Sequence, residues 1–564
     1  MKRISFLFLY SAIVMVFIAA LFSISCGGPS VPPADIVLRS GKIATVDDTF
    51  SMAQAVAVSG DRIVKVGTDE DITPFIGDGT RVIELNGKLI VPGLIDAHAH
   101  LLGYGNALST LDFRGTTSFR QIIDMVAEKA KTLTAGEWII GRSWDQNDWE
   151  AGEFPFHDAL SKDVPNHPVW LTRVDGHAGI ANTKAMDIAG ITTKSKDPDG
   201  GEILRKPGGE PTGVFIDHAM GLVSRHIPNA TPEQRREALY QAAENCLSVG
   251  LTGIHDAGVS PGIIEQYKRL IDEGRLGLRI YAMLGNPGRD DVRDYLRENM
   301  IENYGNHFLK VNSIKLFMDG ALGSRGAAMF EPYSDRSGYS GLLTLTYERA
   351  LAVSRNALEV GCQVCTHAIG DKGNRLILDA YEQALKEHPN PDHRFRVEHA
   401  QVVAPEDFPR FADLGVLPSM QPTHATSDMY WAGDRVGPER VKGAYAWQRF
   451  LEKGCIIPCG SDFPVEENNP MLGIYAGITR QDPSGWPEGG WFPDQCMTRE
   501  QVLRGFTIWA AHAAFQEDIL GSIEEGKLAD MVVLSKDILT VPPKEILDTV
   551  PVYTIVGGKI RYRR

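Results

Sequence analysis

The sequence has few cysteines and a shortage of basic residues. Seven cysteines are spread over 564 residues, which is too few for a disulfide framework. Lys and Arg number 57 against 72 Asp and Glu, giving a formal net charge of −15. Binding to a phosphate backbone needs clustered Lys and Arg, and no such run follows the first few residues. Nucleic acid is therefore excluded as a partner, and we expect a small molecule instead, with a homo-oligomer left open.

Long apolar runs are also absent, except for one at the N-terminus. That run follows Lys2 and Arg3 and ends in small residues at Cys26, as an export signal does. Residues 1–26 resemble a bacterial lipoprotein signal, whose cysteine is lipidated, so Cys26 is the candidate lipidation site. Such signals usually have leucine three residues before the cysteine, where this chain has Ser23, so an uncleaved membrane anchor and plain secretion are the alternatives. We expect an exported protein of the cell envelope, attached to a bacterial membrane only through this segment.

Short β-rich runs mark both ends of the chain. After a proline-rich tether at residues 27–34, residues 35–91 contain several such runs separated by Gly and Asp turns. Residues 516–564 resume the pattern in "ADMVVLSK" and "VPVYTIVGGKIRYRR". Alternating apolar residues between turns predict strands. The sequence thus predicts a small β-sandwich formed from both chain ends, with everything else inserted between them.

Between these ends, residues 92–515 alternate apolar runs with helical segments, which is the pattern of parallel β/α units. Eight runs are candidate strands: "LIDAHAH", "LTGIHDAG", "LRIYAML", "NSIKLFMDG", "CQVCTHAIG", "FRVEHAQ", "GVLPSMQP" and "CIIPCGSDF". Eight strands predict an α/β fold, the (β/α)8 TIM barrel. An insertion at about residues 109–231, after the first barrel strand, is long for a βα loop. We expect it to form a cap or extra subdomain over the site.

Metal-type residues recur at the ends of these candidate strands, where a β/α barrel places its active site. They are His98 and His100 in "DAHAH", Lys315 in "IKLFMDG", His367 in "CTHAIGD", His399 in "RVEHAQ" and Asp462 in "CGSDFP". Because side chains alternate along a strand, His98 and His100 point to the same side. Each residue alone has an ordinary explanation, as a hydrogen-bonded histidine or a helix cap. Their joint occurrence predicts a metal centre.

Several motifs resemble those of the amidohydrolase superfamily, and within it the amidohydrolase-3 branch that includes N-substituted formamide deformylases. The motifs are "VPGLIDAHAH", "DGHAGIANTKAM", "KLFMDGALGSRGAAM", "THAIGD", "VEHAQ", "GSDFPV" and "GSIEEGKLADMVVL". The resemblance runs from about residue 35 to residue 561. It implies a metal-dependent amidohydrolase that acts on a non-peptide C–N bond.

The resemblance also implies a ligand set. The ligands are His98, His100 and Asp462 for the more buried ion, and His367 and His399 for a second ion. Lys315 stands where relatives with two metals carry a lysine carboxylated by CO2, whose carbamate bridges the ions. Such an anion is needed because two divalent cations a few ångströms apart repel each other strongly. The alternative is an unmodified Lys315 extending from the barrel mouth, in which case the site holds a single metal.

Histidine and carboxylate ligands without thiolates favour Zn2+, although Mn2+, Fe2+ or Ni2+ would also be accommodated. A site with nitrogen and oxygen ligands at a barrel mouth is typical of an open catalytic centre rather than a closed structural one. Metal binding lowers the pKa of a coordinated water towards neutrality. We expect Asp462 to act as general base and acid, accepting a proton from that water and passing it to the leaving nitrogen.

Six further residues are candidates for contact with the substrate. They are Trp144, Asp145 and His177 in the insertion, Asp319 and Arg325 after Lys315, and His424 after "SMQPT". The first three resemble substrate-side positions of the branch, and an aromatic ring suits an apolar substituent. Core or cap packing is the alternative for them, and shaping of the Gly-rich loop "DGALGSRG" is the alternative for Asp319 and Arg325.

Two other functions compete with amide hydrolysis. A lactonase or other esterase would use the same metal-bound hydroxide, and a catalytically inactive binding protein would keep the fold without the chemistry. The full set of metal-type residues argues against the inactive protein. A ring deaminase is disfavoured because its H-x-x-E element is missing beside the later histidine, where this chain has "HAIGD".

Overall fold

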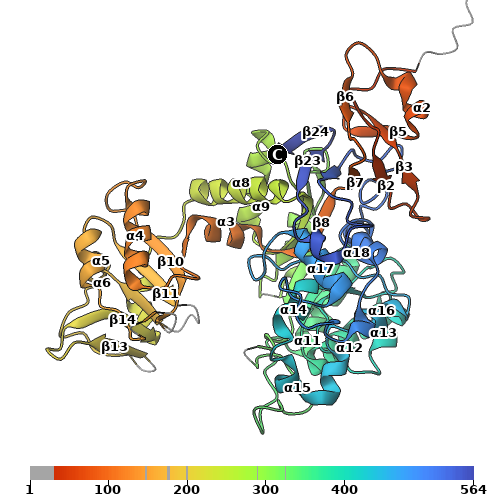
Figure 1. Cartoon of the computed structure of the whole chain (residues 1–564). Coiled ribbons are helices and arrows are strands. Elements are labelled where there is room, and N and C mark those ends of the chain that lie inside the picture. The colour runs from red at the N-terminus through yellow and green to blue at the C-terminus, as the bar shows by residue number, and fades with distance from the viewer. Residues whose placement is uncertain are drawn as a thin grey trace, which may run out of the picture.

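The computed structural model describes residues 31–146, 149–150, 152–173, 178–198, 201–288, 290–323 and 325–564. It contains a β-sandwich, a barrel and a separate lobe (Figure 1). In this part of the chain no helix is both long and apolar enough to cross a membrane. Cys26 with its predicted signal segment, and His177, lie outside the described residues.

Two sheets drawn from both chain ends make the β-sandwich. One has the strand order β5 (Arg62–Gly67), β4 (Ala55–Ser59), β1 (Ile36–Arg39), β6 (Arg81–Glu84). The other has the order β24 (Lys559–Arg563), β23 (Pro551–Val556), β22 (Met531–Leu534), β7 (Leu89–Pro92), β2 (Lys42–Ala44), β3 (Met52–Ala53). Val532 of β22 lies opposite Val91 of β7 in an antiparallel pair, and Leu38, Ile90 and Met531 belong to the buried cluster shared by the sheets. The predicted sandwich is confirmed.

Seven parallel strands form a nearly closed barrel. In order they are β8 (Leu94–Ala99), β15 (Leu251–Val259), β16 (Arg279–Gly285), β18 (Leu309–Phe317), β19 (Gln363–Ala368), β20 (Arg396–His399) and β21 (Leu417–Ser419). A further strand, β17 (Ile301–Tyr304), pairs antiparallel with β18. The parallel strands are seven of the eight predicted from the sequence, and the predicted α/β barrel is confirmed.

The eighth predicted run, residues 455–463, closes the barrel without forming a regular strand. The amide of Gly460 donates to the carbonyl of Met420, just beyond β21, at 3.1 Å, and the amide of Ala97 in β8 donates to the carbonyl of Cys459 at 2.9 Å. A Cβ at Gly460 would lie 2.6 Å from the amide nitrogen of His98. Only glycine therefore lets this segment approach β8 so closely.

Helices follow most of the barrel strands. They include α8 (Pro232–Ser248), α9 (Pro261–Asp272), α10 (Val292–Asn299), α11 (Tyr347–Val360), α12 (Asp371–Glu387), α13 (Phe408–Leu414), α14 (Pro422–Asp428), α17 (Pro470–Thr479), α18 (Arg499–Gly505) and α19 (Ile508–Ala513). Local sequence sets their ends. Before α11 the side chain of Thr346 accepts a hydrogen bond from the amide of Arg349, and after it Gly361 takes a left-handed φ of 72°.

The insertion forms a lobe of its own. Its sheet has the order β13 (Gly201–Arg205), β14 (Pro211–Asp217), β12 (Ala178–Ala181), β11 (Val169–Arg173), β10 (Ile139–Trp144), β9 (Leu111–Asp112). Helices α4 (Phe119–Ala130), α5 (Asp158–Asp163), α6 (Thr183–Ala189) and α7 (Gly221–Ser224) belong to the same segment. In Figure 1 the lobe, orange to yellow, stands apart from the barrel and joins it through α3 (Leu101–Ser109) and α8. The predicted subdomain is present, but it does not pack on the barrel as a cap, because its apolar residues fill cores of their own.

Candidate metal centre

Three predicted ligands meet at the carboxyl end of β8. His98 Nε2 lies 3.6 Å from Asp462 Oδ1, and His100 Nε2 lies 3.2 Å from the same oxygen. One donor atom from each of these residues lies within 4.8 Å of the other two. This is the spacing of donors that share one ion, and it brings together the set predicted for the more buried metal.

A second group of donors shares Asp462. It consists of His399, His424 and Asp462, again within 4.8 Å of one another. His424 Nε2 is 3.9 Å from Asp462 Oδ2, and the His399 and His424 rings are stacked with centroids 5.8 Å apart. The carboxylate of Asp462 therefore lies between the two groups. His424, predicted to face the substrate, lies among the metal-type donors.

His367 lies beside the second group. Its ring centroid is 4.5 Å from that of His399, and its Nε2 is 3.7 Å from an oxygen of Asp319. The buried Nε2 atoms of His367 and His424 have no hydrogen-bond partner among the described residues. A buried polar atom without a partner is costly, and a divalent ion would satisfy both nitrogens. The donors present therefore fit a metal.

Charge and burial keep these side chains in the forms that bind metals. Burial, followed by the nearby Lys315 cation, lowers the pKa of His98 to about 4 and that of His367 to about 3. Burial acts to raise the pKa of Asp462, but the hydrogen bond with His100 and the neighbouring histidines hold it well below its usual value. The imidazoles of His98 and His367 are thus neutral and the carboxylate of Asp462 is ionised near neutral pH.

Lys315 lies beneath the first group. Its side chain is buried, with Nζ 3.4 Å from His98 Nε2 and 4.4 Å from the ring centroid of Phe317. Burial lowers the pKa of Lys315, although Glu398 and Asp462 oppose that effect. The amine thus reaches the donor atom of a predicted ligand, at the position that the sequence resemblance assigned to it.

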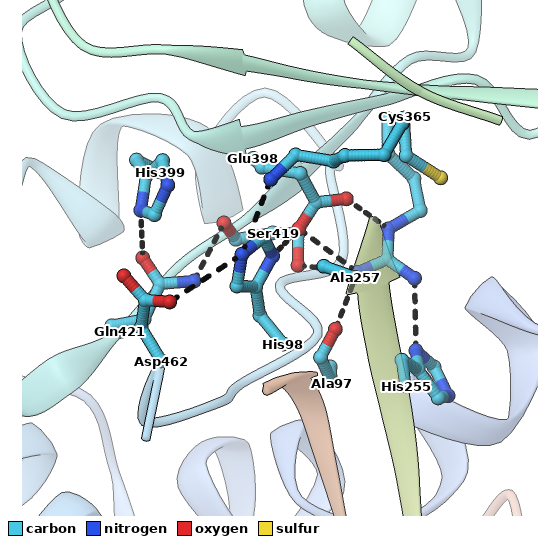
Figure 2. A network of polar contacts seen from close by, with 12 residues as sticks. Ala97, His98, His255, Ala257, Cys365, Glu398, His399, Ser419, Gln421 and Asp462 are labelled. Atoms are coloured by element: carbon cyan, nitrogen blue, oxygen red, sulfur yellow. Dashed lines mark hydrogen bonds and ion pairs between the residues drawn. The ribbon is translucent and has the colours of Figure 1, made fainter. Parts of the chain in front are cut away.

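In three histidines around Asp462, the other ring nitrogen contacts a neighbouring residue. His98 Nδ1 lies 2.6 Å from Glu398 Oε2, His100 Nδ1 lies 3.0 Å from the carbonyl of Ala257, and His399 Nδ1 lies 2.8 Å from Gln421 Oε1. Each neighbour atom is an acceptor, so each Nδ1 donates; Figure 2 shows the contacts of His98 with Glu398 and of His399 with Gln421. In the neutral rings of His98 and His399 the Nε2 atoms are consequently free of protons and available as ligands.

The backbone leaves the extended conformation at two of these residues. His399 has φ 74° and Asp462 has φ 61°, a left-handed region that residues other than glycine seldom adopt. In a regular strand His399 would point away from the side occupied by Arg396 and Glu398. The left-handed turn at the end of β20 breaks that alternation at His399. Such local strain is often found at functional sites.

Two predicted substrate residues lie in the insertion lobe, away from the centre. The Trp144 ring is buried in the lobe core, and its Nε1 donates to the carbonyl of Leu171 at 2.8 Å. Asp145 forms an ion pair with Arg173 at 2.6 Å. These contacts agree with the alternative that Trp144 and Asp145 pack within the insertion. Their role in binding substrate stays a prediction.

Two more candidates shape the loop after β18. Asp319 accepts hydrogen bonds from the amides of Ala328 and Gly370 at 2.9 and 2.8 Å, which ties this loop to the end of β19. Arg325 Nη2 lies 2.8 Å from Asp335 Oδ2. Both contacts correspond to the loop-shaping alternative, although Asp319 also lies next to His367.

Sequence reasoning missed three residues at the centre. Arg396 and Glu398 are two apart on β20, and Phe317 is two residues after Lys315 on β18. Phe317 is 48% exposed, and its ring lies 5.5 Å from that of His367. The available signal was alternation, since charged residues two apart in a buried strand share one face.

A parallel barrel with histidines and a shared carboxylate at its strand ends defines a metal-dependent hydrolase. The chain belongs to the amidohydrolase family, whose model matches residues 81–562. Among solved structures, an uncharacterised metal-dependent hydrolase from Pyrococcus furiosus is 28% identical, with a TM-score of 0.74 over 90% of this chain and 100% of that chain.

Two relatives cover almost the whole chain. The protein LONG AFTER FAR-RED 3 of Arabidopsis thaliana is 36% identical over 94% of this chain and 92% of its own length. The N-substituted formamide deformylase of Arthrobacter pascens is 28% identical over 94% of this chain and 98% of its own length. The similarity therefore includes the sandwich and the insertion as well as the barrel.

Proposed function

We propose that the protein is a metal-dependent amidohydrolase that cleaves the C–N bond of a small amide or N-substituted formamide. The observation that carries this proposal is the ionised carboxylate of Asp462 between two groups of histidine donors at the barrel mouth. The choice of bond rests on the formamide deformylase relative, which is similar over nearly the whole of both chains. A lactonase acting through the same centre is the competing proposal.

The residues that would hold a divalent ion, Zn2+ first among the candidates, are His98, His100 and Asp462. His399 with His367 or His424 would hold a second ion beside it. A bound ion supplies an acidified water and a polarised carbonyl. Asp462 accepts the proton of the attacking water at its carboxylate and delivers it to the leaving nitrogen.

Lys315 decides between one ion and two in this proposal. Burial lowers the pKa of Lys315 and so increases the share of the neutral amine, which is the form that reacts with CO2. Carboxylation would place an anion next to His98 Nε2, which lies 3.4 Å from Nζ. A second divalent ion would then be bound without repulsion from an ammonium group.

We also propose that the protein is exported and lipid-anchored through Cys26, on the sequence pattern alone. Membrane fractionation and mass spectrometry of the mature N-terminus test this proposal. An unmodified N-terminus starting elsewhere than Cys26 would contradict it.

The central test is a hydrolysis screen of N-formyl, N-acyl, carbamate and lactone compounds with the zinc-loaded enzyme. Turnover of N-formyl or N-acyl compounds is expected. If only lactones are hydrolysed, the amidase proposal is wrong and the esterase proposal takes its place. Absence of bound metal after metal-replete purification would favour the inactive binding protein.

A further inference from the structure

We propose that Glu398 is a positioning residue that orients His98 as a metal ligand, and that Arg396 holds Glu398 in place. This inference rests on the proposed metal centre. Neither residue belongs to the ligand set, and both lie below it inside the barrel, fully buried.

The contact between Glu398 and His98 fixes which ring nitrogen carries the proton. Glu398 Oε2 lies 2.6 Å from His98 Nδ1, and an ionised carboxylate can only accept a hydrogen bond. Nδ1 must therefore carry the proton, which leaves the lone pair on Nε2. That atom lies 3.6 Å from Asp462 Oδ1, on the side where the other donors converge.

Arg396 keeps this carboxylate charged and fixed. Its Nε lies 2.7 Å from Glu398 Oε1, and its Nη2 lies 3.0 Å from Oε2, so both oxygens are engaged. A buried carboxylate paired in this way stays a strong acceptor for the His98 proton.

The guanidinium of Arg396 also ties together strands that are far apart in the sequence. Its Nη2 donates to the carbonyl of Ala97 at 2.6 Å and to Ser419 Oγ at 2.8 Å, and its Nη1 lies 2.8 Å from His255 Nδ1. Figure 2 shows these contacts converging from β8, β15 and β21 on one side chain of β20. Because Ala97 directly precedes His98, the hydrogen bond from Arg396 to the Ala97 carbonyl also holds the backbone next to this metal ligand.

Glu398→Gln tests the role with little change of shape. A glutamine amide can present its NH2 group to His98 Nδ1, which moves the ring proton to Nε2 and removes the ligand lone pair. Loss of such a supporting contact typically weakens metal affinity by about 10–100-fold. We expect a loss of this size in the Zn2+ dissociation constant, measured by competition with a chromophoric chelator, and an altered visible spectrum of the Co2+-loaded protein.

The chain contains a matched control. Glu517 also lies between a histidine Nδ1 and an arginine, 3.2 Å from His512 and 2.8 Å from Arg394, but outside the centre. Glu517→Gln should leave both Zn2+ affinity and the Co2+ spectrum unchanged. An equal loss of affinity in both variants would show a general effect of removing an acid paired with a histidine and an arginine, and would overturn the proposal.

Glu398→Asp covers the case in which Glu398→Gln fails to fold. Aspartate keeps a negative charge beside Arg396 but is one methylene shorter, so it cannot hold the 2.6 Å contact with His98 without a shift of the strand. We expect the same direction of metal loss with a retained fold. Wild-type Zn2+ affinity and Co2+ spectrum in a folded Glu398 variant would overturn the proposal, whereas a wild-type protein that binds no metal would overturn the proposed function itself.

Discussion

The two carboxylate oxygens of Asp462 face different histidines: Oδ2 lies 3.9 Å from His424 Nε2, whereas Oδ1 faces His98 and His100. One carboxylate thus serves both groups of donors. A residue in this position can hold an ion through one oxygen while the other oxygen exchanges a proton.

Asp462→Asn should reduce kcat by at least about 10²–10⁴-fold, the usual contribution of a general base, and should reduce metal content far less. The amide keeps one oxygen as a ligand but cannot accept the proton. Steady-state kinetics and metal analysis of the same preparation measure both effects. Near-wild-type turnover with unchanged metal content would contradict the role of Asp462.

His367→Ala and His424→Ala should separate ligand from substrate-side roles. We expect His367→Ala to lose about one ion per chain from a two-ion protein, as the resemblance implies. His424→Ala should keep its metal content and lose about 10²-fold in kcat, because His424 lies next to the proton-accepting oxygen of Asp462. Loss of an ion from the His424 variant instead would place that residue in the ligand set.

Lys315→Ala should lower metal content from about two ions per chain to about one. The reason is that no carbamate can then lie between two cations. Bicarbonate present during metal loading should raise the ion count of the wild type and not that of the variant. Equal ion counts in both proteins, with or without bicarbonate, would indicate an unmodified lysine.

Phe317→Ala should lower kcat/KM for N-alkyl and N-aryl formamides by about 10–100-fold. This is the effect expected from losing an apolar contact worth about 1–3 kcal/mol in the transition state. The exposed ring beside His367 offers a surface for an apolar substituent. Unsubstituted formamide should be unaffected. Phe156→Ala is the matched control, since Phe156 is also an exposed ring with a lysine above it, Lys206, but lies in the insertion lobe. Equal losses for substituted and unsubstituted compounds would contradict this role.

Glu517 should make stability depend on acid pH. Burial acts to raise the pKa of Glu517, but His512 and Arg394 lower it to about 2, against about 4.3 in the unfolded chain. A lowered folded pKa gives stability that is present above the unfolded pKa and is lost as pH falls towards 2. Glu517→Gln should lower the free energy of unfolding by about 1–2 kcal/mol at pH 7. This is less than the full pKa shift would give, because solvent screens the partly exposed carboxylate.

The difference in Tm between these two proteins should shrink as the pH is lowered from about 5 to about 2. Thermal unfolding followed by circular dichroism at several pH values measures this trend. A difference that stays constant or grows in acid would contradict it.

The sequence prediction of the barrel came from apolar runs alternating with helical segments, and that of the first pair of ligands came from the alternation of side chains along a strand. His98 and His100 are two residues apart on β8, so their shared side follows from the sequence alone. The same rule applied to "RVEH" would have found Arg396 and Glu398. It could not have found their partner, because His98 lies 300 residues away from Glu398 and that contact exists only in the folded barrel.

The insertion shows the limit of such prediction. Its existence follows from its length, but its position depends on α3 and α8, the two helices that join it to the barrel. No local pattern encodes the angle at which such a pair holds a lobe. For Trp144 the resemblance and the aromatic ring indicate the substrate, with packing as the alternative, and its indole lies in the core of the lobe.

The pairing of β22 with β7 has a consequence for the order of events during synthesis. β7 runs, after the single residue Gly93, into β8 and His98, and the amide of Gly93 donates to the carbonyl of Asp530 at 2.8 Å. The strand that leads into the first ligand strand, β7, thus has β2 on one side from early in synthesis, but gains β22 on the other side only after residue 534 has been made. A chain that lacks β22 would leave β7 without this partner just before the strand that carries the first metal ligands, so metal loading is expected to follow, rather than guide, the pairing of β22 with β7.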